Sequence, residues 1–135
     1  MNRNQGDGSL NIKFGWIWLL IGIIEAAFIG MYAFKSDWLG GYTSLARRFI
    51  RLSHIAFMAL SIVNIIYGLY LPLVQIPNKI KKVGSYSMIL AAISMPLICI
   101  LSAFQIKFQA LFFMPVLFFI IAVVIMIIGQ SRSKI

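Results

Sequence analysis

Four long apolar runs dominate this 135-residue chain and limit what it can fold into. A helix needs about 20 residues to cross the hydrocarbon core of a bilayer, and each run is long enough. Backbone polar groups in lipid must find partners within the segment, which favours helices. The sequence therefore predicts an all-α integral membrane protein, an antiparallel up-down bundle of four transmembrane helices over Phe14–Phe34, Leu52–Leu71, Ser85–Phe104 and Ala110–Gly129.

The composition agrees with a membrane protein and excludes a soluble one. Hydrophobic residues make up 61% of the chain and charged residues 11%, whereas soluble domains have about 25% charged residues. So few polar side chains cannot cover a soluble globule. A net charge of +9 would suggest a nucleic-acid partner in a soluble protein. Because nearly all charged residues lie outside the apolar runs, we interpret them as membrane-flanking charges and expect no nucleic-acid partner.

Polar residues and prolines set the expected boundaries. Residues 1–13 form a polar N-terminal segment that we expect to be mobile, and residues 14–135 form one transmembrane domain. Thr43 or Ser44 is a candidate N-cap that would start the second helix in water at about Leu45, giving a helix over 45–71. Pro72 and Pro77 would end this helix and shape the following loop.

Prolines within the later helices predict two kinks. Pro96 and Pro115 lie inside the third and fourth apolar runs, where a proline removes a backbone hydrogen bond. In the third run, Pro96 leaves the Ala92 carbonyl without its usual helical partner. That carbonyl could bind an ion or a water, or the helix could simply bend there.

Four spans place both termini on the same side of the membrane. That side carries Arg3, Lys13, Lys79, Lys81, Lys82, Arg132 and Lys134, and the other side carries Lys35, Arg47, Arg48, Arg51 and Lys107. Positive residues favour the cytoplasmic side. The sequence therefore predicts a multi-pass protein with cytoplasmic N- and C-termini.

Glu25 is the only charged residue within the four spans. An ionised carboxylate at this depth is costly, so we expect it to be protonated or paired. One hypothesis is a proton or cation site formed by Glu25 with Tyr32, Ser61 and Asn64. The alternative is a neutral acid that hydrogen-bonds across a helix interface. Gly22 and Gly30, on either side of Ala26, predict a ridge where a second helix approaches closely.

One face of the second helix collects its polar side chains. A 4–3 spacing typical of a heptad seam joins Arg47, Arg51, His54, Met58, Ser61, Ile65 and Gly68. We expect this seam to face protein or a cofactor. His54, Arg47, Arg51 and Met58 are the candidate contacts to a b-type haem, a quinone or a lipid, with the arginines holding an anionic group. The alternative for His54 is a hydrogen-bonded histidine between helices, so no cofactor is required.

Depth along the spans predicts which polar residues meet. Counting from the middle of each apolar run places Tyr32 level with His54, and Glu25 level with Ser61. We therefore expect His54 to pair with Tyr32, and Glu25 with Ser61 or Asn64. On this count a direct bond between Glu25 and His54 is not expected.

A short stretch of the first helix resembles a known transporter family. Residues Ile21–Ser36, IGIIEAAFIGMYAFKS, resemble the first helix of small multidrug-resistance transporters. In that family a single membrane glutamate exchanges protons for cationic substrates, and the resemblance places Glu25 in that role. The later helices depart from the family pattern: the second carries the Arg/His seam, and the expected Tyr/Trp/Gly-rich substrate motif and glycine-rich dimerisation helix are missing.

Three functions follow as hypotheses. The first is a non-catalytic subunit of a larger membrane complex, such as an electron-transfer complex, with other membrane subunits or a second copy as partners. The second is a small proton-coupled transporter that uses Glu25, and the third is a haem- or quinone-binding protein that uses His54. We expect no enzymatic activity and no metal site, because a single histidine, a single cysteine and three carboxylates do not match the usual catalytic or zinc recipes.

Overall fold

The computed structural model describes residues 8–33, 35 and 37–132, and the regular secondary structure in this part of the chain is all helix, without a strand. Three short 3₁₀ segments lie between the long helices, at Trp38–Gly40, Leu71–Leu73 and Ile106–Phe112. The long helices are α1 (Ser9–Ala33), α2 (Leu45–Tyr70), α3 (Asn78–Phe104) and α4 (Phe113–Arg132).

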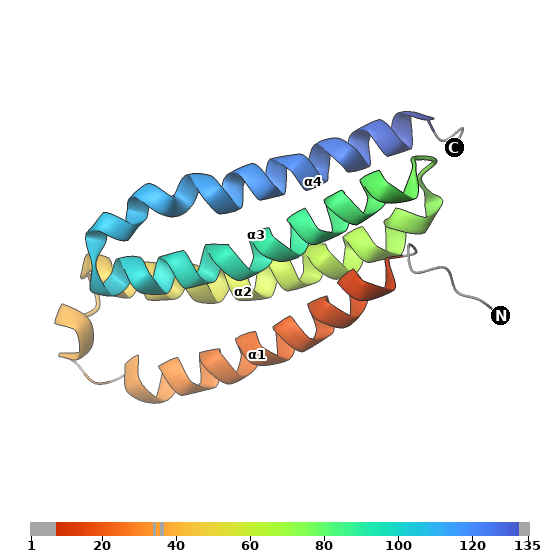
Figure 1. Cartoon of the computed structure of the whole chain (residues 1–135). Helices are drawn as coiled ribbons and strands as arrows, with labels where there is room; N and C mark the ends of the chain where they lie inside the picture. The colour runs from red at the N-terminus through yellow and green to blue at the C-terminus, as the bar shows by residue number, and fades with distance from the viewer. Residues whose placement is uncertain (1–7, 34, 36, 133–135) are drawn as a thin grey trace.

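The structure confirms four helical segments of membrane length. Ser9–Met31, Leu45–Leu73, Asn78–Phe104 and Ile106–Arg132 are each long and apolar enough to cross a bilayer. Consecutive helices pack against each other in chain order, and α1 also touches α3. The start of α1 and the end of α4 lie at the same end of the molecule (Figure 1). We call this the terminal end, and the end that holds the α1–α2 and α3–α4 connections the opposite end.

The first helix begins earlier than the apolar run indicates. It starts at Ser9, and the Asn11 side chain is fully buried. The predicted mobile segment over 1–13 is therefore wrong from Ser9 onward, while residues 1–7 lie outside the described residues. The prediction failed because the Asn11 side chain has hydrogen-bond partners on α2 and α3, so this polar residue can be buried in the protein.

The start of α2 agrees with the sequence. Ser44 is its N-cap, since the Ser44 hydroxyl oxygen accepts a hydrogen bond from the Arg47 backbone N–H at 3.2 Å. The same hydroxyl donates to the Leu39 carbonyl at 2.6 Å. Leu39 has a φ of 52°, a left-handed conformation that is unusual for a residue other than glycine. The cap of α2 therefore also holds the preceding turn in place.

The two prolines within the apolar runs occupy different positions. Pro115 lies in the first turn of α4, where the 3₁₀ segment ends and a missing N–H removes no helical hydrogen bond. Pro96 lies inside α3. The indole N–H of Trp18 on α1 donates to the Ala92 carbonyl at 3.0 Å. A side chain from another helix thus satisfies the carbonyl that Pro96 leaves without its helical partner.

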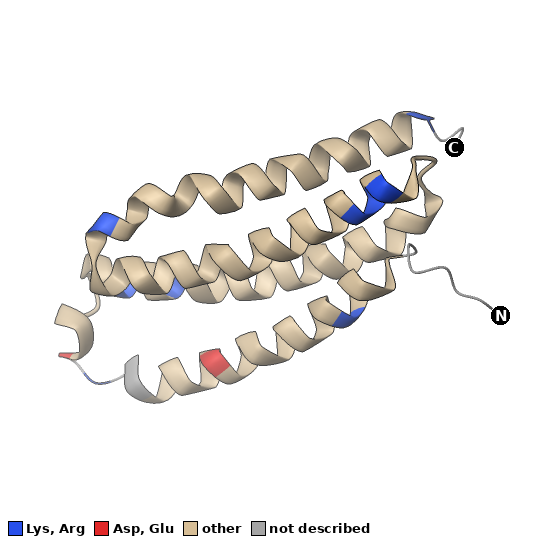
Figure 2. Cartoon of the chain, viewed as in Figure 1, with Lys and Arg blue, Asp and Glu red and all other residues tan. Residues whose placement is uncertain are grey.

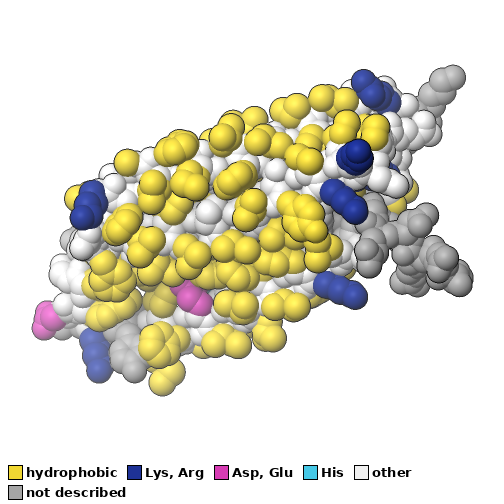
Figure 3. All heavy atoms as spheres, viewed as in Figure 1, with side chains coloured by type: hydrophobic (Ala, Val, Ile, Leu, Met, Phe, Trp, Pro, Cys, Tyr) yellow, Lys and Arg dark blue, Asp and Glu magenta, His cyan; other side chains and the backbone are white. Residues whose placement is uncertain are grey.

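The surface is divided along the length of the helices. Hydrophobic side chains cover most of the face in Figure 3, with the basic residues towards the two ends. The buried core is small and is centred on Tyr67, Leu71, Val74, Ile76, Met88 and Ala122. Only 11% of the most apolar window is buried in both the first and the last of the four segments. These two outer helices therefore offer their apolar faces to lipid or to another protein.

Candidate functional site

Glycines bring α1 against α2 and set the register between them. A Cβ atom on Gly15 would lie 2.6 Å from Ile65 Cγ1 and 2.7 Å from the Ser61 carbonyl oxygen, and one on Gly8 would lie even closer to the Gly68 backbone. A Cβ atom on Gly22 would lie 3.0 Å from Phe57 Cβ. Gly15 and Gly22 are seven residues apart in α1, so they lie along one face of that helix, and Gly8, seven residues earlier, immediately precedes it.

The predicted glycine ridge is correct at only one end. Gly22 contacts α2, but a Cβ atom on Gly30 would meet nothing within 4 Å. The close approach therefore lies nearer the start of α1 than the sequence indicated. The two helices are less tightly packed towards the end of α1, and Glu25 lies between the tight and the loose parts of the contact.

This register places Glu25 beside His54. His54 Nδ1 lies 3.1 Å from Glu25 Oε2. Glu25 is eight residues before the end of α1, and His54 is nine residues after the start of α2. At 1.5 Å per residue, both groups are about 12–14 Å from the ends of their helices at the opposite end. The prediction that these two residues do not pair is therefore wrong.

A third side chain completes the group. The Ser53 hydroxyl is fully buried and lies 3.3 Å from Glu25 Oε1, while its shorter hydrogen bond, 2.8 Å, goes to the Ile50 carbonyl. The group remains partly open, because 17% of the Glu25 side chain and 36% of the His54 side chain are exposed. Glutamate, histidine and a serine hydroxyl thus meet at the α1–α2 contact, on the edge of the protein.

The other predicted partners of Glu25 bind elsewhere. The Ser61 hydroxyl donates to the Phe57 carbonyl at 2.5 Å, and the Asn64 amide donates to the carbonyls of Leu60 and Met88. Pairing of Glu25 with Ser61 or Asn64 is therefore wrong. The side chain of Tyr32 lies outside the described residues, and so does its predicted contact with His54.

The wrong pairing has a single cause. Ser61 comes seven residues after His54, which is two turns of helix. The predicted pairs assumed that the middles of the apolar runs lie at the same depth. In the structure, the glycine contacts displace α1 along α2 by those two turns. The spacing of Gly8, Gly15 and Gly22 was the signal that could have fixed the register.

From His54 to Gly68, the seam on α2 faces α1. Gly68, Ile65 and Ser61 meet glycines of α1, and Met58 Sδ comes within 3.4 Å of the Cβ position of Gly22. Met58 is therefore part of a helix contact. Arg51, the second residue of the seam, is exposed, and its guanidinium lies 4.6 Å from the centre of the Tyr42 ring.

Arg47 does not extend towards His54. Its side chain is buried, with Nε donating to the Trp38 carbonyl and Nη2 to the Lys35 carbonyl, both at 2.6 Å. The predicted role of Arg47 in holding an anionic cofactor group or lipid is not supported by this geometry. Its guanidinium instead ties the α1–α2 connection to the start of α2, because the two loop carbonyls need buried donors.

A second polar cluster joins three helices near the terminal end. The Asn11 amide donates to Asn64 Oδ1 at 3.0 Å and to the Ser85 carbonyl at 3.2 Å, and the Ser85 hydroxyl donates to Asn11 Oδ1. Asn11 and Asn64 are both fully buried. Because α1, α2 and α3 each contribute one residue, this cluster fixes their mutual position. Sequence analysis missed it by assigning Asn11 to the mobile segment.

The comparisons with known proteins add no family or fold relationship. No family model matches the sequence, and no curated protein or solved structure matches it significantly. The function is therefore argued from the Glu25–His54 pair. Both side chains can gain and lose protons, and both can form charge-assisted hydrogen bonds. Within the described residues, no group of three or more His, Cys, Asp or Glu side chains could hold a metal ion.

Proposed function

We propose that this chain is a non-catalytic subunit of a larger membrane complex and that the Glu25–His54 pair marks the surface where a partner subunit packs. In this proposal the four helices cross the bilayer as an antiparallel up-down bundle, α3 is kinked at Pro96, and both termini are cytoplasmic. An electron-transfer complex is one class of assembly that uses small helical subunits of this kind.

The partial exposure of the pair is the observation that carries the proposal. Glu25 and His54 lie about 12–14 Å inside helices that are long enough to span the membrane. Polar and ionisable groups at such a depth are costly and normally face protein or a water-filled cavity. Since 36% of the His54 side chain is exposed, another protein surface covering the pair would remove it from lipid.

The surroundings of the pair also fit a helix-packing surface. Phe28, about one turn after Glu25, and Ile55, beside His54, are each about 60% exposed. Gly30 leaves open space around its Cα atom. Large apolar side chains beside a small residue and a polar pair are features of helix interfaces in membranes, where close packing and interhelical hydrogen bonds act together.

Purification from the native membrane tests this proposal. In a mild detergent, the wild-type chain should elute with other subunits at a fixed stoichiometry. Glu25→Ala should weaken that association, because the partner loses its polar contact. Asp37→Asn, which removes the acidic residue of the α1–α2 connection, should leave it intact. Elution of the wild-type chain as a lone monomer would rule out the subunit hypothesis.

A second function, proton-coupled transport, is favoured by the contact between two proton-exchanging groups. A proton taken up by Glu25 or His54 changes the charge of a pair whose atoms are 3.1 Å apart, and such residues within spans often form proton pathways. In liposomes that contain only this chain, Glu25→Gln should abolish proton-coupled uptake of a cationic substrate, and Asp37→Asn should not. Equal uptake by wild type and Glu25→Gln would remove Glu25 from any transport mechanism.

A further inference from the structure

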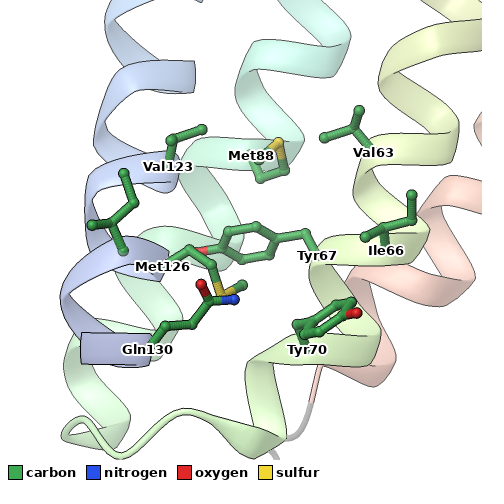
Figure 4. Close-up of a pocket in the computed structure, with 9 residues that line it drawn as sticks. Val63, Ile66, Tyr67, Tyr70, Met88, Val123, Met126 and Gln130 are labelled. Carbon is green, nitrogen blue, oxygen red and sulfur yellow. The ribbon is translucent and has the colours of Figure 1, made fainter. Parts of the chain in front are cut away.

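An apolar groove runs between α2 and α4 towards the terminal end, with α3 at its base (Figure 4). Its volume is about 260 Å³. Val63 and Val123 line its inner part, and Tyr70 and Gln130 line the part nearest the α2–α3 connection. The outermost lining residues of α2 are seven positions apart, and so are those of α4, so the groove extends for about 10 Å along the helix axes.

The polarity of the groove changes along its length. Tyr67 is a wall residue, but its hydroxyl donates to the Ala122 carbonyl at 3.3 Å and is buried. The inner part therefore presents hydrocarbon to an occupant. The phenol of Tyr70 and the amide of Gln130 are exposed, and they lie at the mouth. A long apolar chain with a polar head matches this arrangement.

Positive charge gathers at the same end of the molecule. Gly129 packs against Val74, with its Cβ position 2.8 Å from Val74 Cβ, which brings the end of α4 to the α2–α3 connection. Arg132 follows on α4, and α3 begins with a run of lysines. Of the described residues, the basic ones at the terminal end are Lys13, Lys79, Lys81, Lys82 and Arg132 (Figure 2).

No acidic residue offsets this charge within the described part of the terminal end. The two described carboxylates, Glu25 and Asp37, belong to the other half of α1 and to the α1–α2 connection. Basic residues at a membrane surface attract anionic lipids. The mouth of the groove thus lies in the part of the molecule that best accommodates a negatively charged headgroup.

We propose that this groove binds one acyl chain of an anionic phospholipid, whose phosphate headgroup lies among the basic residues at the terminal end. The groove runs parallel to the helices, as an acyl chain does in a bilayer. Any lipid could fill the apolar part. The basic residues select the anionic headgroup, so the site combines an apolar contact with an electrostatic one.

Lipid binding to the purified full chain tests the proposal. The probes are dioleoylphosphatidylglycerol and dioleoylphosphatidylcholine, which share their acyl chains and differ in headgroup charge. Native mass spectrometry should show stronger retention of the anionic lipid, and that lipid should raise the thermal unfolding temperature more. Equal retention of both lipids would overturn the proposal.

Charge variants test the headgroup contact. Lys81→Gln, Lys82→Gln and Arg132→Gln together should reduce the preference for the anionic lipid by about tenfold or more. The matched control removes three positive charges at the opposite end, through Arg48→Gln, Arg51→Gln and Lys107→Gln, and should keep the preference. If both triple variants lose it equally, the site at the terminal end is ruled out.

Groove variants test the acyl-chain contact. Ile66 lines the groove and Ile62, one turn earlier, does not, yet both side chains are 48% exposed. Ile66→Trp should fill part of the groove and weaken retention of the anionic lipid, whereas Ile62→Trp should not. Stabilisation of the wild type by inorganic phosphate alone, to the extent given by the lipid, would show that the groove takes no part and would overturn the proposal.

Discussion

At the scale of single residues, several polar groups in this chain are satisfied by partners on other helices. The Trp18 indole binds the carbonyl that Pro96 leaves open, Asn11 reaches residues on two helices, and Glu25 meets His54. Water is scarce inside a bilayer, so an unpaired polar group there is costly. Each of these contacts therefore also specifies which helices are neighbours and at what depth they meet.

The contribution of the Trp18–Ala92 hydrogen bond to the free energy of unfolding can be measured, because Pro96 is the reason that the Ala92 carbonyl lacks a helical partner. Trp18→Phe should lower the free energy of unfolding, since the carbonyl loses its donor. In a Pro96→Ala background, the new backbone N–H can bond with the Ala92 carbonyl inside α3. The same Trp18→Phe change should then cost less, with a coupling free energy of about 1 kcal/mol. Reversible unfolding in detergent micelles, followed by circular dichroism, gives all four values of this cycle.

A second tryptophan on α1 supplies the control for this cycle. Trp16 is 60% exposed, and its replacement by phenylalanine should be additive with Pro96→Ala. An additive result for Trp18 as well would mean that its indole bond does not compensate for the proline. Because each cycle compares the same aromatic change in two backgrounds, differences in side-chain size cancel.

At the scale of helices, the fit of α1 against α2 depends on where glycine is required. Gly15→Ala would place a methyl group 2.6 Å from an Ile65 side-chain atom and 2.7 Å from a backbone oxygen of α2. We expect it to lower the free energy of unfolding by about 1–3 kcal/mol, as overpacking commonly does. Gly30→Ala adds its methyl group to open space and should be neutral or stabilising by up to about 1 kcal/mol. Urea or SDS titration of both variants measures the difference.

The two glycine variants also test the register. If Gly30→Ala proves as damaging as Gly15→Ala, the tight contact must extend to the end of α1, as the sequence alone had indicated. That register would separate Glu25 from His54. Equal tolerance of both variants would instead show that α1 does not pack closely on α2 at either position.

The sequence predicts that four long helices exist, but it does not predict how α1 and α2 are aligned along each other. Length and hydropathy predict four membrane-length helices, and the side chain of Ser44 predicts the start of α2. The length of an apolar run, however, reflects the thickness of the bilayer. It does not determine how two neighbouring helices are aligned along their axes. The register depends on backbone contacts at Gly15 and Gly22, and an error of two turns there changes every polar pair. For the same reason, Ser53 was not identified as a partner of Glu25. The Asn11 cluster was missed for a different reason, because the polar start of the chain was assigned to a mobile segment and not to a helix.

At the scale of the whole molecule, the charges lie at the ends and the apolar surface lies between them. Figure 2 shows basic residues at both ends and an acidic residue within α1. Each end carries five basic residues among those described. At the terminal end they are Lys13, Lys79, Lys81, Lys82 and Arg132, and at the opposite end they are Lys35, Arg47, Arg48, Arg51 and Lys107. The proposed cytoplasmic termini therefore depend on Arg3 and Lys134, so the described charges alone do not decide the orientation.

Single cysteines can decide the orientation, because the native Cys99 is fully buried and should not react with a membrane-impermeant maleimide. Gln75→Cys and Ser131→Cys place exposed thiols at the terminal end, and Thr43→Cys and Gln109→Cys place them at the opposite end. The first pair should be labelled only from the cytoplasmic face, and the second only from the other face. Reversed labelling would keep four crossings but overturn the orientation, since the pairs would exchange sides. Labelling of Gln75→Cys and Thr43→Cys from one face would contradict a membrane crossing by α2 itself.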